Sequence, residues 1–302
     1  MGVTPYALGV TEQQEFRETV QANKRLKTMF QSKRKPRSGL GSALSILEVI
    51  YHSIVRSIRK QHNNAFLAIG INMMQAVMFV AAFYAMFSIL GMRGSALRGD
   101  FLVYIMSGIF LYLTHIKSVA AISAAEGPSS AMMQHAPMTT MISIASAAFS
   151  TLYVQILSLC LIFFIYHVAW TPLEIHQPIA AFGMVLLSWF TGCCLGMVFL
   201  AMKPWFPGLV TIISMVYQRA NMIASGKMFV ANVLPAHMLA MFDWNPLFHV
   251  IDQARGFAFQ NYFPRNSNWE YAFTVGCVFL IIGMMGEFYT RKHASLSWEA
   301  KR

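Results

Sequence analysis

Long apolar stretches alternate with short polar connections along most of the chain. Each stretch carries few charged residues and is about as long as a helix needs to cross a bilayer, roughly 20 residues. The stretches cover residues 65–90, 101–125, 139–166, 178–202, 206–225 and 271–290. The pattern predicts an all-α integral membrane protein with six transmembrane helices per protomer, which together form one domain over residues 65–290.

A different pattern precedes the first apolar stretch. Between residues 43 and 64, apolar side chains recur at helical spacing on one face, and polar side chains occupy the opposite face. The apolar face carries Ala43, Leu47, Ile50, Tyr51, Ile54 and Ile58, and the polar face carries Glu48, His52, Arg56 and Arg59. We expect an amphipathic helix in the membrane interface, although packing on a soluble partner fits the same pattern. Ser45 and Glu48 have the spacing of a capping box at its start.

Basic residues gather near the two ends of the chain. Of the 23 Lys and Arg residues, 11 precede residue 65 and four lie in residues 291–302, and the net charge is +11. Cytoplasmic segments of membrane proteins carry such an excess, so we expect both termini in the cytoplasm and no nucleic-acid partner. Residues 1–42 predict a flexible basic arm, and residues 291–302 predict a cytoplasmic tail.

The composition indicates a membrane protein rather than a soluble enzyme. Hydrophobic residues make up 56% of the chain and charged residues only 12%, which lies outside the usual globular range. The four cysteines, Cys160, Cys193, Cys194 and Cys277, fall inside apolar stretches, where we expect unbridged packing residues. The first 30 residues contain no apolar core of signal-peptide length, so we expect no cleaved export signal.

Two of the predicted spans contain basic residues. Lys117 lies in the second span with His115 close by, and Arg219 lies midway along the fifth. Charged groups are costly at membrane depth and therefore point to a role. They either pair with buried acids or carbonyls for structural reasons, or line a wet path for an anionic cargo, and the sequence leaves both interpretations open.

The segment between the fifth and sixth predicted spans is apolar but interrupted by polar residues and prolines. These are Lys227, Pro235, His237, Asp243, Trp244, Asn245, Pro246, His249, Asp252 and Arg255. Irregular backbone at membrane depth needs cover from protein or water. We therefore expect a re-entrant hairpin with short helices at the outer mouth, with an ordinary outer loop as the alternative. Asn245 and Pro246 predict a turn that opens a short helix.

Motifs for catalysis are missing from the sequence. The chain has no Walker A motif, no His-Glu-x-x-His zinc motif, no Cys-x-x-Cys pair and no Gly-x-Ser-x-Gly nucleophile elbow. We therefore expect no catalytic residue, no metal site and no cofactor on this chain, and an enzyme acting on lipid-linked sugars stays an alternative. Most aromatic residues are expected to anchor or pack the helices. Trp189, Tyr217 and Trp244, near basic positions, are candidates for flat faces on which sugar rings slide.

Several stretches of the sequence carry a family resemblance. They are WNPLFHVIDQAR at residues 244–255, FYTRKHA at the end of the last span, YIMSGIFLYLTHIKSVAAISAAEG at 104–127 and VFLAMKPWFPGL at 198–209. Together with the spacing of the spans, they resemble ABC-2 type permeases, and more closely the transmembrane subunit of capsular polysaccharide exporters. Asn245, Pro246 and Leu247, followed by Arg255, match the family motif.

One departure from the family lies near the start of the first span. Members often have a Glu-Pro pair there, where this chain reads Gly70, Ile71, Asn72 and Met73. The basic arm before the amphipathic helix is also longer than usual. These differences bear on how the chain docks its partner and on which substrate it moves.

The resemblance implies a half-transporter in the bacterial inner membrane. In such exporters two permease copies join two separate ATP-binding subunits, which hold ATP and Mg, and a periplasmic co-polymerase or adaptor and an outer-membrane channel can complete the machinery. The implied cargo is a lipid-linked, acidic capsular polysaccharide. The residues expected to contact the ATPase are Arg56, Arg59, Glu126, Met133, Gln134, His135 and Pro137.

The mechanism expected from this resemblance couples nucleotide binding to a channel. Closure of the ATP-binding subunits pushes the amphipathic helix and the 126–137 link, and a channel opens between two copies of the first and fifth spans. Weak successive contacts guide the substrate, because tight binding would stall it. The expected path consists of Lys117, Trp189, Tyr217, Arg219, Lys227, Trp244 and Arg255. O-antigen, teichoic acid or another glycolipid is an alternative cargo, and a secondary transporter is an alternative class.

Overall fold

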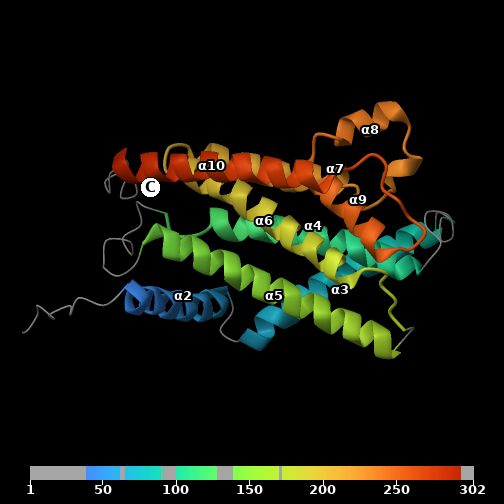
Figure 1. Cartoon of the computed structure of the whole chain (residues 1–302), viewed down its shortest axis with the longest axis horizontal. Coiled ribbons are helices and arrows are strands. Elements are labelled where there is room, and N and C mark those ends of the chain that lie inside the picture. The colour runs from blue at the N-terminus through green and yellow to red at the C-terminus, as the bar shows by residue number, and fades with distance from the viewer. Residues whose placement is uncertain are drawn as a thin grey trace, which may run out of the picture. The chain divides into compact units, whose positions relative to one another are not determined.

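The computed structural model describes residues 39–61, 65–89, 91, 100–127, 139–169 and 172–293. The chain divides into two compact units, Met1–Glu48 and Val49–Arg302. Every regular element of the described residues is a helix (Figure 1). The long helices are α2 (Gly39–Gln61), α3 (Ala65–Ile89), α4 (Phe101–Ser123), α5 (Thr140–Ala169), α6 (Pro178–Met202), α7 (Pro207–Ala224) and α10 (Trp269–His293), and the short ones are η2 (Ala231–Val233), α8 (Ala236–Phe242) and α9 (Pro246–Ala258).

Five of these helices are long and apolar enough to cross a membrane. They are Ile69–Ile89, Phe101–Ser123, Thr140–Ala169, Pro178–Met202 and Trp269–His293. This confirms the prediction of an all-α, multi-pass membrane protein. The fifth predicted span, residues 206–225, is helix α7, but it is not among the five because Gln218, Arg219 and Asn221 interrupt its apolar sequence. A sixth span at α7 therefore stays a prediction.

The amphipathic segment forms a helix, but it begins earlier than the sequence suggested. Helix α2 begins at Gly39 and ends at Gln61, whereas the prediction covered residues 43–64. Ser45 therefore lies inside the helix, and the predicted capping box at Ser45 and Glu48 is wrong. Glycine and serine between residues 38 and 45 are weak helix formers, which is why the pattern of apolar residues set the predicted start too late.

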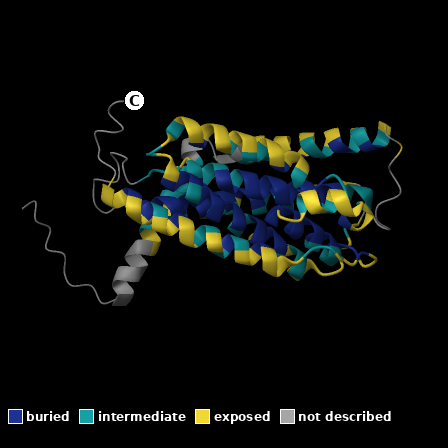
Figure 2. Ribbon diagram, turned by 90° about the horizontal axis from the view of Figure 1, so that it is seen from above, coloured by how far each residue is buried: buried dark blue, intermediate teal, exposed yellow. Residues whose placement is uncertain are grey.

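Helices α4 and α6 form the centre of the unit Val49–Arg302. Within their most apolar windows, 78% of α4 and 67% of α6 are buried, against 11% for α3 and 22% for α10. Figure 2 shows the buried residues in the middle of the helical bundle and the exposed residues on the outward faces of its outer helices. Helix α6 is the common partner of α4, α9 and α10. The peripheral position of α3 leaves an apolar surface suited to lipid or to a second copy.

Glycines allow α6 to approach its two neighbours closely. A Cβ on Gly192 would lie 2.5 Å from the carbonyl oxygen of His115, and a Cβ on Gly196 would lie 2.7 Å from the Cβ of Ile122. On α10, a Cβ on Gly283 would lie 2.8 Å from the Cβ of Met197. In lipid no hydrophobic force drives helices together, so such close contact of backbones is a main source of their association.

Helix α9 begins at the turn that the sequence predicted. The side chain of Asn245 accepts a hydrogen bond from the Leu247 amide at 3.1 Å and caps the helix, and Pro246 occupies the first turn, where no amide hydrogen is needed. Leu247, Val250 and Ile251 are buried in the main core. Helix α9 packs against α4, α6 and α10. The expected re-entrant depth of this segment in the membrane stays a prediction.

The cysteines are unbridged, as the sequence predicted, but the exposed Cys160 is not a packing residue within the described chain. All four are free thiols, so none forms a disulfide. Cys194 is buried in the main body of α6, and Cys193 packs against the small core around Ile122.

Candidate functional site

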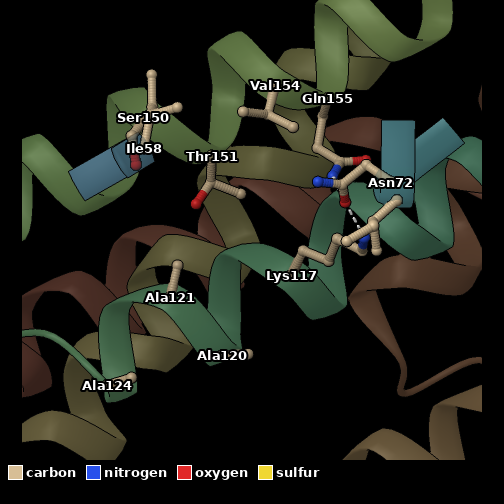
Figure 3. Close-up of a pocket in the computed structure, with 11 residues that line it drawn as sticks. Ile58, Asn72, Lys117, Ala120, Ala121, Ala124, Ser150, Thr151, Val154 and Gln155 are labelled. Carbon is tan, nitrogen blue, oxygen red and sulfur yellow. Dashed lines mark hydrogen bonds between the residues drawn. The ribbon is translucent and has the colours of Figure 1, made fainter. Parts of the chain in front are cut away.

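A polar pocket opens among the helices α2, α3, α4 and α5. Its volume is about 310 Å³, and its polar wall comes from Asn72, Lys117, Ser150, Thr151 and Gln155 (Figure 3). The rest of the wall is made of Ile58, Ile71, Ala120, Ala121, Ala124 and Val154. We call this cavity the Lys117 pocket. Small alanines on α4 leave the space that larger side chains would fill.

Lys117 supplies the positive charge of this pocket. Its ammonium donates a hydrogen bond to the amide oxygen of Asn72, which also accepts a bond from Gln155 at 3.4 Å. No carboxylate among the described residues lies within ion-pair distance of Lys117. A lysine inside a span is costly unless it pairs or reaches water, and here its partner is neutral. The charge is therefore available to an anion.

Helix α2 closes one side of the Lys117 pocket. Ile58 lines the cavity, and the hydroxyl of Ser57 lies 3.2 Å from that of Ser150 on α5. The hydroxyls of Ser150 and Thr151 both donate to the carbonyl of Ala147. Their oxygens are therefore left as acceptors, and that of Ser150 accepts from Ser57. The end of α2 that meets the pocket is the end where the sequence placed Arg56 and Arg59.

A second cation lies deep in the fold and is held quite differently. Arg255 of α9 is 1% exposed and donates to the carbonyls of Gly226 at 2.9 Å, Phe229 at 2.6 Å and Lys227 at 2.7 Å. Its guanidinium carbon lies 4.3 Å from the centre of the Tyr104 ring. We call this arrangement the Arg255 clamp. It supplies donors to three carbonyls of the irregular segment after α7, of which only that of Gly226 has a second donor among the described residues, the Phe229 amide at 3.4 Å.

Gly226 and Gly108 make the Arg255 clamp sterically feasible. Gly226 has a φ of +73°, a backbone conformation that favours glycine, and a Cβ there would lie 2.6 Å from the Phe248 ring. A Cβ on Gly108 of α4 would lie 3.0 Å from the Arg255 guanidinium. The segment after α7 can therefore fold tightly against α4.

Lys227 occupies an aromatic box beside the clamp. Its side chain is 3% exposed, and the ammonium lies 3.5 Å from the centre of the Tyr112 ring, 5.5 Å from that of Phe83 and 5.9 Å from that of Phe79. It donates no hydrogen bond to any described residue. The negative faces of the rings attract the cation. Lys227 thus ties the segment after α7 to α3 and α4.

Asn245 joins the end of α7 to the start of α9. Besides capping α9, its side-chain amide donates to Asn221 and to the carbonyl of Ala224, both at 2.9 Å. Asn221 is buried on α7. The predicted family motif of Asn245, Pro246 and Leu247 therefore has a clear structural role in this chain.

The predicted aromatic residues do not come together. Tyr217 donates or accepts a bond with His115 at 2.7 Å, and the other ring nitrogen of His115 contacts Thr191 at 3.1 Å, so this network links α4, α6 and α7. Trp189 donates to the carbonyl of Ala148 on α5 at 2.9 Å. Trp244 is 64% exposed and its carbonyl accepts from Tyr271 on α10. These three rings lie in separate surroundings and form no shared platform in this structure.

The predicted path residues occupy environments of three kinds. Lys117 faces a cavity, Lys227 and Arg255 are enclosed by protein, and Arg219 is exposed on α7. Around Arg219 the exposed face of α7 is apolar, with Ile212, Val216 and Ile223 each more than half exposed. Of the four basic residues on the predicted path, Lys117 and Arg219 are the two whose charge can reach a ligand in this conformation. The roles of the enclosed pair in transport stay a prediction.

Of the predicted ATPase-coupling residues, Arg56 and Glu126 are described with their surroundings. Arg56 is exposed on α2, and the amide of Glu126, directly after α4, donates to the hydroxyl of Ser143 at 3.1 Å. Arg59 lies in α2, and its side chain is outside the described part of the structure. Met133, Gln134, His135 and Pro137 lie outside the described residues.

Near Asp252 a polar network fixes the connection from α9 to α10. Its carboxylate accepts from the hydroxyls of Tyr262 at 2.5 Å and Ser267 at 2.7 Å. Burial, and then the charge of Asp252, raise the pKa of Tyr262. The Tyr262 hydroxyl therefore stays a proton donor, and this network is structural. Among the described residues no group of three His, Cys, Asp or Glu side chains could hold a metal ion.

Several residues that shape the pocket and the helix contacts are not among the predicted site residues. Gln155 and the Ser150–Thr151 pair are polar residues inside an apolar span. Their position could have predicted a polar contact between helices, as the charged residues did. Gly192 and Gly196 have the four-residue spacing of a close helix contact, which was also readable. Asn72 stood out only as a departure from a family pattern, and its contact with Lys117 requires the fold.

Comparison with known proteins adds no relative to this description. No family model matches the chain, and no curated protein matches it. The functional argument therefore rests on the sequence and on the geometry of the sites.

Proposed function

We propose that this chain is the transmembrane subunit of an ATP-driven exporter of the ABC-2 type. The observation that carries the proposal is a lysine inside a membrane helix, Lys117, which faces a polar cavity and has no carboxylate partner among the described residues. A cation placed in this way suits an anionic cargo that must be held weakly and released. The sequence resemblance supplies the class of transporter and the cargo, a lipid-linked acidic polysaccharide.

The proposed assembly contains two copies of this chain and two ATP-binding subunits. In it, α7 serves as a sixth span, the segment from residue 226 to 268 dips into the membrane, and both termini face the cytoplasm of a bacterial inner membrane. The exposed apolar faces of α3 and α7 support contact with a second copy, because each carries large side chains that find no partner within the described chain. A periplasmic adaptor and an outer-membrane channel belong to the same proposal.

The proposed coupling runs through α2. Closure of the ATP-binding subunits moves α2 and the link after α4, and the contacts of Ser57 and Ile58 carry that motion to the wall of the Lys117 pocket. Arg219, exposed on α7, offers the next cation to the cargo. Weak contacts at separated cations allow the substrate to advance step by step.

The first test is biochemical. The full chain, purified in detergent from its native membrane, should bring down a separate subunit with a P-loop ATPase motif, and ATP hydrolysis should require that subunit. Hydrolysis by this chain alone, or recovery of a monodisperse particle without detergent, would contradict the proposal. A hydrolase activity on lipid-linked sugars without nucleotide would favour the alternative of a membrane enzyme.

A second test uses charge reversal on α7. Arg219→Glu should block export of the acidic glycan while the subunits stay assembled, because the side chain is exposed on α7. Arg265→Glu is the matched control, since Arg265 is exposed in the loop before α10. Loss of assembly in Arg219→Glu would instead assign Arg219 a structural role.

A further inference from the structure

We propose that the Lys117 pocket binds a phosphate ester that carries neighbouring hydroxyl groups, such as the head of an anionic lipid. The proposal deepens the proposed function and rests on it only for the biological source of that phosphate. Binding itself is a property of the described pocket. It can be measured without any ATP-binding partner.

The charge of the pocket favours an anion. Lys117 carries three donor hydrogens, and it gives one to the amide oxygen of Asn72. Asn72, Gln155, Ser150 and Thr151 are all neutral, so nothing on the polar wall cancels the charge. A bound phosphate would accept the remaining donors of Lys117 in charge-assisted bonds, which are among the strongest hydrogen bonds in proteins.

The acceptors of the pocket favour hydroxyl groups beside that phosphate. The hydroxyls of Ser150 and Thr151 spend their hydrogens on the carbonyl of Ala147, at 3.2 Å and 2.9 Å. Thr151 therefore offers its lone pairs to donors from a ligand, while the Ser150 oxygen already contacts the Ser57 hydroxyl at 3.2 Å and has one lone pair left. Glycerol phosphates and sugar phosphates combine an anion with several hydroxyl donors, whereas sulfate and simple carboxylates do not.

The position and size of the pocket fit a lipid head. Lys117 lies six residues before Ser123, the last residue of α4, and at 1.5 Å per residue this is about 9 Å from the end of the helix. The cavity of about 310 Å³ is at the lower end of the range of ligand sites. Ile58, Ile71 and Val154 line it beside the polar groups, and acyl chains can lie against such side chains.

The test measures lipid binding to the full-length chain in nanodiscs or by native mass spectrometry. The probe is phosphatidylglycerol in a background of phosphatidylcholine. Lys117→Gln should weaken phosphatidylglycerol binding roughly tenfold or more, because a charge-assisted bond is lost. Lys117→Arg should keep most of the binding. Lys292→Gln, which removes an exposed lysine of α10, should leave binding unchanged.

A second variant keeps Lys117 but neutralises its charge with a neighbouring carboxylate. Asn72→Asp places a carboxylate where Lys117 already donates, so an internal ion pair forms and phosphatidylglycerol binding should fall as in Lys117→Gln. Asparagine and aspartate have nearly the same size, so the fold should survive. A thermal unfolding curve of each variant checks this, and it keeps the proposal testable if Lys117→Gln does not fold.

Competition with small soluble anions identifies which chemical group the pocket binds and whether that group comes from a lipid or from a soluble molecule. Glycerol 3-phosphate should displace phosphatidylglycerol from the wild-type chain more strongly than inorganic phosphate or glucuronate. Direct binding of glycerol 3-phosphate to a chain that does not bind phosphatidylglycerol would support the same phosphate site with a soluble source. Equal binding by wild type, Lys117→Gln and Asn72→Asp would overturn the proposal, and so would displacement by glucuronate alone. None of these outcomes depends on an ATP-binding subunit, so the exporter assignment can fail separately.

Discussion

The Arg255 clamp and the Lys117 pocket both place a basic side chain inside the helical bundle, with opposite consequences. Arg255 gives its donors to three backbone carbonyls and stacks on Tyr104 in a site that is almost fully buried. Lys117 gives one bond to a neutral amide and faces a cavity. The Nε of Arg255 has no partner among the described residues, but the site around it is closed. A cation whose donors hold backbone carbonyls in a closed site supports the structure, while a cation whose donors face a cavity can bind a ligand. Both residues lie in apolar segments of the sequence, so their sequence position does not distinguish the structural cation from the ligand-binding one. Their hydrogen-bond partners in the fold do.

The two sites also differ in the helices that build them. The Arg255 clamp joins α9, α4 and the segment after α7, which belong to the buried centre. The Lys117 pocket lies where the peripheral helix α3 and the end of α2 meet α4 and α5. Elements at the periphery can move at lower cost, since fewer contacts break. A site that must open and close is therefore expected there.

Removing Arg255 should have the largest effect on stability. Arg255→Met removes the side-chain donors of three buried carbonyls, and of these only that of Gly226 keeps another donor among the described residues, the Phe229 amide at 3.4 Å, so we expect a loss of about 3 kcal/mol or more. The measurement is the unfolding midpoint in detergent and the amount of folded chain in the membrane. Arg265→Met, on an exposed arginine of the following loop, is the control and should change neither. A stable, abundant Arg255→Met protein would break the structural half of the comparison.

A smaller loss is expected where α6 touches α4. Gly192→Ala would place a methyl group 2.5 Å from the carbonyl oxygen of His115, which is backbone and cannot turn away. Overpacking of this kind costs about 1–3 kcal/mol. Gly183→Ala lies on the same helix with nothing within 4 Å and should be neutral. Equal unfolding midpoints for the two variants would show that the α4–α6 contact does not set the stability of the centre.

The next largest loss of stability is expected on removing the cap of α9. Asn245→Ala removes the cap and two hydrogen bonds to the end of α7, and we expect a loss of about 1–2 kcal/mol. Asn268→Ala removes an exposed cap at α10 and should lose less. The comparison uses chemical unfolding monitored by the same probe for both variants. If the two losses are equal, the contacts of Asn245 with α7 add nothing to capping.

The smallest change in stability is expected at Lys227. Its ammonium makes no hydrogen bond to the described residues and is held by aromatic rings, so Lys227→Met can fill the same box with an apolar chain. We expect a shift of less than about 1 kcal/mol, in either direction. Export measured on the same variant then sharpens the comparison. Normal stability with lost export would move Lys227 from the structural group to the ligand-binding group.

Much of the architecture follows from the apolar pattern. The lengths of α3, α4, α5, α6 and α10 agree closely with the predicted stretches, because the hydrocarbon core sets both length and composition. The turn at Asn245 and Pro246 was also predictable, since capping and proline chemistry are local. The start of α2 at Gly39 was not, because propensity alone is weak where no apolar pattern continues.

The sites were predictable only in their single residues. Lys117 and Arg219 stand out as charges in apolar segments, but the pairing of Lys117 with Asn72 joins residues 45 positions apart. Arg255 looked equally suited to a substrate path, and only its three carbonyl partners reveal the clamp. Contacts between distant segments depend on how helices pack, and that information is spread over many residues such as Gly192 and Gly196.

The distinction between a ligand-binding cation and a structural cation is tested most directly at Lys117. Cells that express Lys117→Gln are compared with wild type for the amount of folded chain in the membrane and for glycan at the cell surface, with Lys117→Arg as the charge-preserving control. The account predicts a normal amount of folded chain, lost export in Lys117→Gln and export largely retained in Lys117→Arg. Undiminished export by Lys117→Gln, or loss of its folded chain, would contradict it.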